Sequence, residues 1–303
     1  MNWQALSKSM NTQLTQQNLP TIQIITAHAI QGGDTHQAYQ LHSGKQNYFL
    51  KLAPAHNLSI LQAELHNLQA IKQSNTLNCP PPYAAGIHQE HAWLLMEFIT
   101  LNKQGDDIQR GRDLAFMHHH IHHTPDTLKP FGWFEDNFIG RTRQSNIWSS
   151  DWISFYGQQR LQPQFEMSQL NGAPKSLYQS GQALIERLPL WFQDYQPKPS
   201  LLHGDLWSGN SAFNTEGDPV FFDPACYYGD RETDIAMTEL FSGFSSDFYN
   251  GYQEIFPLDS GYQNRKTLYN LYHTLNHFNL FGGSYLQQAQ QTIQQLLQES
   301  TSK

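Results

Sequence analysis

Short apolar runs punctuated by Gly, Asp, Ser and Pro fill the first hundred residues of the chain. Runs of this kind are typical of strands in an antiparallel meander. Residues 58–73 differ, because their apolar positions recur every three or four residues and predict a helix. A short amphipathic helix is predicted at 3–17. The strands are expected at residues 21–28, 37–41, 48–52, 83–87 and 92–98, which makes a five-stranded sheet with one crossover helix.

Longer segments with helical spacing dominate the rest of the chain. The polar stretch 101–106 reads as a connector, so the sequence predicts an N-terminal lobe at 1–99 and a C-terminal lobe at 100–303. Helices are expected at residues 107–122, 151–162, 176–193, 232–242, 245–254, 262–279 and 284–299. One β-rich interruption is expected at 200–206 and 213–223, with a turn at 214–218. The predicted fold class is α+β, with a small antiparallel sheet lobe and a larger, mainly helical lobe.

Composition and charge narrow the possible partners and compartments. The chain has 303 residues, enough to bury a sizeable core, and 18 Lys and Arg against 26 Asp and Glu give a net charge of -8. This balance argues against nucleic acid as the main partner, since phosphate backbones are bound by clustered cations. Two cysteines supply no disulfide framework or zinc pattern, and no apolar run is long enough for a membrane span or an export signal. We therefore expect a cytoplasmic protein.

The strongest chemical signal is the segment His203-Gly204-Asp205-Leu206-Trp207-Ser208-Gly209-Asn210, followed after a hairpin by Asp223-Pro224-Ala225. Phosphoryl transfer needs one carboxylate near the attacking hydroxyl, together with amide and carboxylate oxygens that hold Mg²⁺ between phosphates. Asp205, Asn210 and Asp223 match these needs in type and order. The alternative is purely structural: a turn at Asp205, a cap at Asn210 and a strand end at Asp223.

These residues resemble the fructosamine kinase family. The resemblance rests on the 203–210 segment, on Asp223-Pro224-Ala225 and on Tyr228-Gly229-Asp230-Arg231-Glu232-Thr233-Asp234. It extends to Phe131-Gly132-Trp133, Asp136-Asn137, Ile139-Gly140, Thr142, Gln144-Ser145-Asn146 and Trp148. The family belongs to the protein-kinase-like fold, alongside aminoglycoside and choline phosphotransferases.

Several of the matched residues can be given an expected role. Asp205 is expected to be the catalytic carboxylate, and Asn210 and Asp223 are expected to bind Mg²⁺, as their chemistry also indicates. Trp207 lies inside the same loop and is expected near the acceptor. The remaining roles are assigned as follows: Asp230 and Glu232 to substrate contact, His203 and Asp234 to structural support of the loop.

The N-terminal lobe is expected to hold the nucleotide. Gly32, Gly33 and Asp34 resemble a turn that covers phosphates, although such a turn also closes ordinary hairpins. Lys51 is a charge within an apolar strand and needs a partner if it points inward, for which Glu64 in the following helix is the candidate. The alternative places Lys51 and Glu64 on the solvent face.

In the protein-kinase-like fold that the resemblance implies, the strand that ends at residues 97–99 meets adenine at the junction between the lobes. Backbone atoms of Glu97, Phe98 and Ile99 would make that contact. Like the glycine turn and the Lys51–Glu64 pair, these three residues are predicted to bind ATP.

Two conspicuous side-chain clusters have simpler explanations. In the histidine run at 118–123, residues four apart lie on one helix face and could pair on zinc, but no third ligand is evident. We expect His118 to pack inward and the other histidines to be solvated. The aromatic residues between 131 and 156 could line an acceptor pocket or form the core of the helical lobe.

The resemblance implies an ATP- and Mg²⁺-dependent kinase that phosphorylates the C3 hydroxyl of ketosamines, free or protein-bound, and so leads to deglycation. The first alternative is a related kinase for aminoglycosides, choline or homoserine. A non-catalytic nucleotide-binding protein is the second, and the presence of Lys51, Asp205, Asn210 and Asp223 argues against it. Neither a nucleic acid nor a membrane is expected as a partner.

Overall fold

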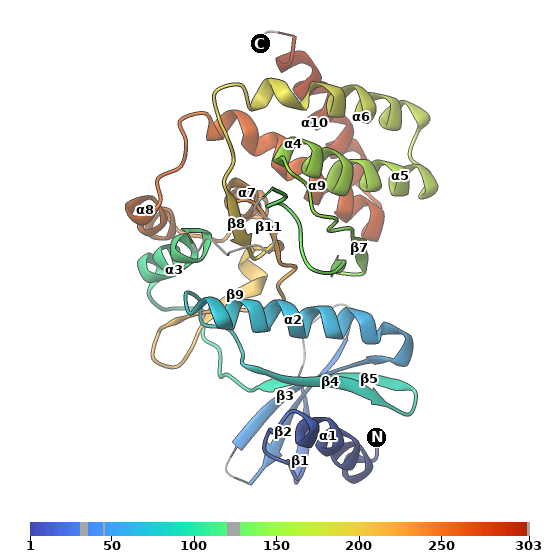
Figure 1. Cartoon of the computed structure of the whole chain (residues 1–303), viewed down its shortest axis with the longest axis vertical. Helices are drawn as coiled ribbons and strands as arrows, with labels where there is room; N and C mark the ends of the chain where they lie inside the picture. Colours follow the sequence, from blue (N-terminus) through green and yellow to red (C-terminus); the bar gives the residue numbers. More distant parts are fainter. Residues whose placement is uncertain (31–35, 45, 120–127, 302–303) are drawn as a thin grey trace.

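The structure is a computed structural model that describes residues 1–30, 36–44, 46–119 and 128–301. Figure 1 shows a sheet-based N-terminal part, crossed by one long helix, below a larger assembly of helices. The chain passes between them through residues 98–106, which lie outside any helix or strand of more than one residue.

The N-terminal sheet is antiparallel and has the order β1-β2-β3-β5-β4. Its strands are β1 (Thr26–Ile30), β2 (Gln37–Ser43), β3 (Gln46–Pro54), β4 (Pro82–His88) and β5 (His91–Glu97). This confirms the prediction of five strands with a helix between the third and the fourth.

Helices cover both faces of this sheet. Side chains alternate between the two faces of a strand, so β3 presents Leu50 and Leu52 to α1 (Trp3–Gln16) and Ala53 to α2 (Leu58–Ser74). Helix α2 buries its stripe of Leu61, Leu65, Leu68 and Ile71 against the sheet and the helical lobe. Lys51 shares the parity of Ala53 and therefore points toward α2.

The C-terminal part is mainly helical. Its α-helices are α3 (Asp107–His119), α4 (Trp152–Phe155), α5 (Gln162–Leu170), α6 (Lys175–Arg187), α7 (Glu232–Leu240), α8 (Ser246–Ile255), α9 (Tyr262–Phe281) and α10 (Tyr285–Glu299). A π-helical segment, Tyr156–Leu161, joins α4 to α5, and short 3₁₀ segments lie at Ala55–Asn57, Leu188–Trp191 and Ser208–Asn210. Among the described residues, no helix is both long and apolar enough to cross a membrane.

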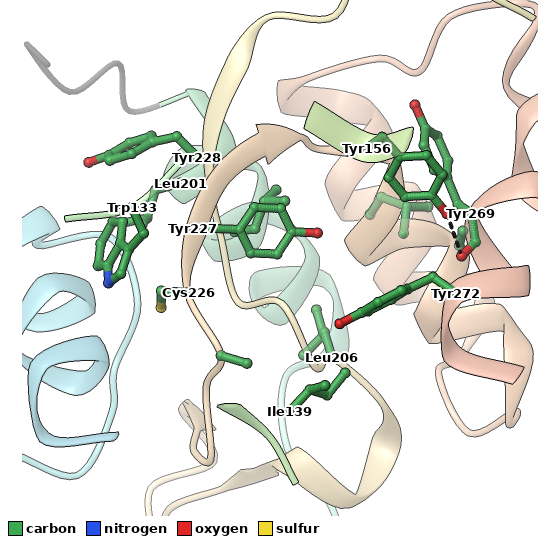
Figure 2. Packing of buried hydrophobic residues seen from close by; sticks show 14 of the residues in the cluster. Trp133, Ile139, Tyr156, Leu201, Leu206, Cys226, Tyr227, Tyr228, Tyr269 and Tyr272 are labelled. Atoms are coloured by element: carbon green, nitrogen blue, oxygen red, sulfur yellow. Dashed lines mark hydrogen bonds between the residues drawn. The ribbon is translucent and has the colours of Figure 1, made fainter. Parts of the chain in front are cut away.

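Three two-stranded ladders lie between the helices and the N-terminal sheet. They pair β6 (Asn137–Ile139) with β7 (Thr142–Gln144), β8 (Pro199–Leu202) with β11 (Tyr227–Asp230), and β9 (Ser211–Phe213) with β10 (Pro219–Phe221). In Figure 2, Tyr227 and Tyr228 point to opposite sides of β11, toward the helices and toward Trp133 respectively. The alternation ties β11 into the core on both sides.

Several predicted boundaries were wrong for identifiable reasons. The first strand begins at Thr26 instead of residue 21, because the backbone of Ile22 bonds to side chains of α1, Ser7 and Asn11. The strand predicted at 200–206 ends at Leu202, since the next residues leave the sheet for a loop. The pairs β6–β7 and β8–β11 were not predicted, and neither was α5.

Candidate active site

One cleft of about 810 Å³ is lined by residues of both lobes. Apolar side chains at the end of β5 and in the connector form one part of its wall, and these include Met96, Phe98, Ile99 and Leu101. Charged and polar side chains, among them Lys51, Asp205, Asn210 and Asp223, form another part. The cleft therefore joins an apolar surface suited to a ring with a polar surface suited to a charged group.

Lys51 connects the sheet, helix α2 and the end of β10. Its Nζ lies 2.6 Å from Glu64 Oε1 and 2.6 Å from Asp223 Oδ1. Burial alone would lower the pKa of Lys51, but the two carboxylates outweigh it and raise that pKa above its usual value. Lys51 is thus a cation of the cleft wall that two carboxylates hold in place.

The loop of residues 203–210 brings Asp205 and Asn210 together. Asn210 Nδ2 donates to the backbone oxygen of Asp205 at 2.8 Å and to Asp205 Oδ2 at 3.2 Å. Gly204 has a φ of 81°, and a Cβ there would lie 2.0 Å from the backbone oxygen of Ala225. Only glycine fits this close crossing of two backbones.

The two aspartates of the cleft differ in their affinity for protons. Burial and the nearby charge of Asp223 raise the pKa of Asp205 to about 7. Burial also favours the neutral form of Asp223, but the charge and hydrogen bond of Lys51 hold its pKa below the usual value. Asp223 stays ionised at neutral pH, while Asp205 can exchange a proton there.

Asp234 supports the 203–210 loop from behind. At the first turn of α7, it accepts hydrogen bonds from the backbone N–H groups of His203 at 2.7 Å and Gly204 at 2.9 Å. His118 Nε2 lies 3.1 Å from the same carboxylate, and the Tyr252 hydroxyl lies 2.8 Å from His118 Nδ1. His118 packs inward as predicted, and it fixes Asp234 in one orientation.

His203 also contacts the other side of the site. Its Nε2 lies 3.0 Å from the backbone oxygen of Phe222, the residue before Asp223. Asp223 itself has a φ of 57°, a left-handed conformation that Asp tolerates better than most residues. The imidazole therefore links the segments that present Asp205 and Asp223.

Asp230 and Glu232 do not line the cleft, which corrects the prediction that they contact substrate. Both side chains are fully buried. Asp230 accepts hydrogen bonds from the hydroxyls of Tyr195 at 2.9 Å and Tyr269 at 2.5 Å, and Glu232 binds Arg265 through both carboxylate oxygens. The motif places these acids in the interior, because β11 turns there into α7. We name Asp230, Glu232 and Asp234 the buried brace.

A buried amide network, not predicted from the sequence, positions the chain after Asp223. Asn67 of α2 donates to the backbone oxygen of Pro224 at 2.9 Å, and Asn137 of β6 donates to that of Cys226 at 2.7 Å. Asn146 donates to Asn137 Oδ1 at 2.9 Å and accepts from Arg160 at 2.6 Å. The sequence signal was the conspicuous cluster of Asn and Gln at 137–146, which had no assigned role.

The other predicted site residues divide by location. Trp207, Glu97, Phe98 and Ile99 line the cleft, and Trp207 keeps 41% of its surface exposed. Gly32, Gly33 and Asp34 lie outside the described residues, as do residues 120–123 of the histidine run. Most of the predicted aromatic cluster is core, since Phe131, Trp133, Trp152, Phe155 and Tyr156 are all buried.

The chemistry of the oxygen donors fits a metal ion that is shared with phosphates. Among the described residues, no three His, Cys, Asp or Glu side chains form a metal site by themselves. Asn210 uses its amide N–H₂ toward Asp205, which leaves the amide oxygen without a donor among the described residues, and Asp223 has one oxygen on Lys51. Two such oxygens hold Mg²⁺ when phosphate oxygens and water complete the shell.

Comparison with known proteins identifies the family. The sequence model of fructosamine kinase matches residues 3–299. The chain belongs to the fructosamine kinase family. It is 40% identical over 297 residues to a probable ketoamine kinase of Synechocystis sp., covering 97% of each chain. It is also 38% identical over 277 residues to the chloroplastic protein-ribulosamine 3-kinase of Arabidopsis thaliana, covering 91% of this chain and 83% of the relative.

Solved structures agree with the fold of this fructosamine kinase family member. A Haemophilus somnus protein, solved as a candidate fructosamine-3-kinase, superposes with a TM-score of 0.83 at 28% identity, over 96% and 97% of the two chains. The choline kinase of Streptococcus pneumoniae superposes with a TM-score of 0.60 at 14% identity, over 98% and 99% of the chains. The fold is the predicted protein-kinase-like one, and the protein is an enzyme that transfers phosphate to a hydroxyl group.

Proposed function

We propose that this enzyme phosphorylates the C3 hydroxyl of the sugar in ketosamines, with ATP as the phosphate donor. The family membership supports the class of acceptor, and the name of the Arabidopsis relative, protein-ribulosamine 3-kinase, supports position 3. One structural observation carries the proposal: Lys51, Asp205, Asn210 and Asp223 all line one cleft beside an apolar surface.

Each of these residues has a definite task in the proposal. Adenine lies against the backbone of residues 97–99, and Lys51 contacts the phosphates while Glu64 holds it in place. Asn210 and Asp223 would hold Mg²⁺, which would neutralise charge on the phosphates. This division leaves Asp205 as the carboxylate nearest to the acceptor.

Asp205 orients the attacking hydroxyl and accepts its proton. A pKa of about 7 suits both tasks, because the ionised form accepts a hydrogen bond from the hydroxyl and can hold the proton after transfer. In a loose phosphoryl-transfer transition state, orientation contributes more than basicity. Asp234 and His203 are proposed to hold the backbone of the 203–210 loop in place and so to fix the position of Asp205.

The proposed product explains a biological role. In a ketosamine 3-phosphate, enolisation of the C2 carbonyl toward C1 expels the phosphate from C3 and leaves an imine at C1. Water hydrolyses this imine to the free amine and a 3-deoxy dicarbonyl sugar. The enzyme would thereby remove sugar from free amines or protein lysines. We infer that deglycation is the consequence of phosphorylation at C3.

A panel of acceptors tests the proposal. Purified enzyme with ATP and Mg²⁺ would be given ketosamines of four, five and six sugar carbons, together with choline, homoserine and an aminoglycoside, and phosphate transfer would be followed by mass. Phosphorylated ketosamine is expected, and its formation should depend on Asp205. Transfer only to a non-sugar alcohol would contradict the proposal, and nucleotide binding without transfer to any acceptor would favour a non-catalytic role.

A further inference from the structure

Arg141 is a cleft residue to which the proposed mechanism gives no task. It occupies the two-residue turn Gly140–Arg141 between β6 and β7, where Ile139 pairs with Thr142. It lines the same cleft as Asp205 and Trp207 and is an exposed side chain. Among the described residues it forms no ion pair and no hydrogen bond through its side chain.

Its neighbour Arg143 shows what a structural arginine in this hairpin looks like. Arg143 pairs with Asp136 at 2.7 Å and does not line the cleft. The two arginines belong to the same hairpin and carry the same charge, but one has a protein partner and the other faces the cleft. Arg141 is therefore available to a ligand.

The hairpin holds Arg141 at a fixed place. Gln144 of β7 donates to Asn137 Oδ1 at 3.1 Å and accepts from the Tyr272 hydroxyl at 2.7 Å. At the tip, a Cβ on Gly140 would lie 3.4 Å from Leu280 near the end of α9. Both strands and the turn are thus anchored to the helical lobe, which favours a charge positioned for recognition.

The charges that line the cleft make this arginine unusual. Of the described lining residues, Glu64, Glu97, Asp205 and Asp223 are acidic, and only Lys51 and Arg141 carry a permanent positive charge. Lys51 is already paired with two carboxylates. Burial and the charge of Lys51 lower the pKa of His36 to about 4, so this neighbour is neutral at pH 7. Arg141 is the one unpaired cation of the described cleft wall.

The turn that carries Arg141 lies away from the connection between the lobes. Figure 1 shows α3, which follows the connection between the lobes, and β7 on opposite sides of the molecule. The apolar surface for adenine lies at that connection. The turn that carries Arg141 instead lies beside Leu280, and both Leu280 and Phe281, which is 56% exposed, line the same cleft. An apolar surface beside a single guanidinium suits a ligand with a carbon skeleton and one anionic group.

We propose that Arg141 binds an anionic group of the ketosamine, away from the hydroxyl that is phosphorylated. The inference rests on the proposed function and narrows its substrate class. The anion is either a carboxylate on the amine carrier, as in adducts of free amino acids, or a phosphate ester at the far end of the sugar. Arg141 also disfavours cationic acceptors such as aminoglycosides, since a second positive charge would be placed beside it.

Three acceptors with the same ketose separate these sources. The first has an uncharged amine carrier, the second has a carrier with a carboxylate, and the third has an uncharged carrier and a terminal sugar phosphate. Steady-state kinetics with each acceptor and with ATP would be measured for the native enzyme, Arg141→Gln, Arg141→Lys and the matched control Arg143→Gln. Because Arg141 is exposed in a turn, its replacement should leave the thermal midpoint unchanged.

The expected result is a charge-dependent loss. Arg141→Gln should lower kcat/KM by about tenfold for the anionic acceptor that Arg141 binds, mainly through KM, with the uncharged acceptor changed by less than about twofold. Arg141→Lys should restore part of the loss, and Arg143→Gln should behave like the native enzyme. The acceptor that responds identifies the anion.

Three outcomes would overturn the inference. An equal loss with all acceptors together with a raised KM for ATP would mean that Arg141 contacts the nucleotide. If all three acceptors are turned over and Arg141→Gln changes the kinetics of neither anionic acceptor, the proposal for Arg141 is wrong, while the proposed ketosamine kinase activity stands. No turnover of any ketosamine by the native enzyme would remove the proposed function and this subsite with it.

Discussion

Five of the seven acidic residues from position 205 to position 234 fall into two groups with different surroundings. Asp205 and Asp223 line the cleft, where Lys51 is the one permanent cation that contacts either of them among the described residues. The buried brace of Asp230, Glu232 and Asp234 lies behind them. Its carboxylates accept hydrogen bonds from tyrosine hydroxyls, an arginine and backbone N–H groups. The same residue type is thus reactive in one group and structural in the other.

Asp205 in the cleft and Asp234 in the brace differ in how completely their negative charge is compensated. Burial raises the pKa of Asp205 to about 7, since no cation contacts it and Asp223 is nearby. Burial would also raise the pKa of Asp234, but hydrogen bonds from His118 and the loop backbone keep it below the usual value. Incomplete compensation leaves a carboxylate able to change protonation during a reaction, while full compensation fixes the surrounding chain.

The largest expected difference between the groups is in turnover. Asp205→Asn keeps the size and polarity of the side chain but cannot accept the proton, so kcat should fall about 10³-fold. Nucleotide affinity, measured by calorimetry, should change little. The matched variant in the brace, Glu232→Gln, should keep the native KM for ketosamine in the protein that folds.

This pair of variants can contradict the comparison. A raised KM for ketosamine in folded Glu232→Gln would mean that Glu232 contributes to substrate binding, although the structure buries it outside the cleft. Near-native turnover by Asp205→Asn would remove Asp205 from the reaction.

The second expected effect is on stability. Glu232→Gln leaves Arg265, a buried guanidinium, with Asp259 as its remaining carboxylate partner, which should cost about 3 kcal/mol of unfolding free energy. Asp205→Asn should not be destabilising. Denaturant titrations of both variants at pH 7.5 measure the contrast, and equal losses would mean that the ion pair of Glu232 with Arg265 stabilises the protein no more than Asp205 does.

The smallest effect is the pH dependence of that stability. The pKa of Asp205 is raised to about 7 in the native state, above its value in the unfolded chain. Between pH 4 and 7 the native state therefore binds one proton more than the unfolded chain. The free energy of unfolding consequently falls as the pH rises through this range. Asp205→Asn lacks this penalty. The variant should equal the native protein near pH 4 and be more stable by about 1–2 kcal/mol above pH 7. A difference in unfolding free energy between the two proteins that stays constant across this pH range would show that burial does not raise the pKa of Asp205.

Local patterns in the sequence sufficed for much of the fold. Apolar spacing predicted α2 and the five strands around it. The charge of Lys51 within an apolar strand, taken together with the motif at 203–223, indicated Glu64 as its partner, and the structure has this contact. The turn at 214–218 also lies between β9 and β10 as predicted. These features depend on interactions between residues near in sequence or on simple alternation.

The unpredicted features depend on contacts between distant segments. The hairpin β6–β7 has only three residues in each strand, and three of its four inward side chains are polar (Asn137, Thr142 and Gln144, beside Ile139), so no apolar alternation marks it. The burial of Asp230 and Glu232 follows from Tyr195, Tyr269 and Arg265, which lie 33 to 39 residues away in the chain. A motif gives the type of a side chain, but packing decides which way it faces.

The central claim, that Asp205 directs phosphate from ATP to the C3 hydroxyl of a ketosamine, is tested most directly by the structure of the product. Native enzyme and Asp205→Asn would be incubated with Mg²⁺, ATP and a ketosamine labelled with ¹³C in the sugar, and phosphorus–carbon couplings would be read by NMR. The account predicts phosphate on the C3 oxygen with the native enzyme and a trace at most with the variant. Phosphate on another oxygen, or equal product from both proteins, would contradict it.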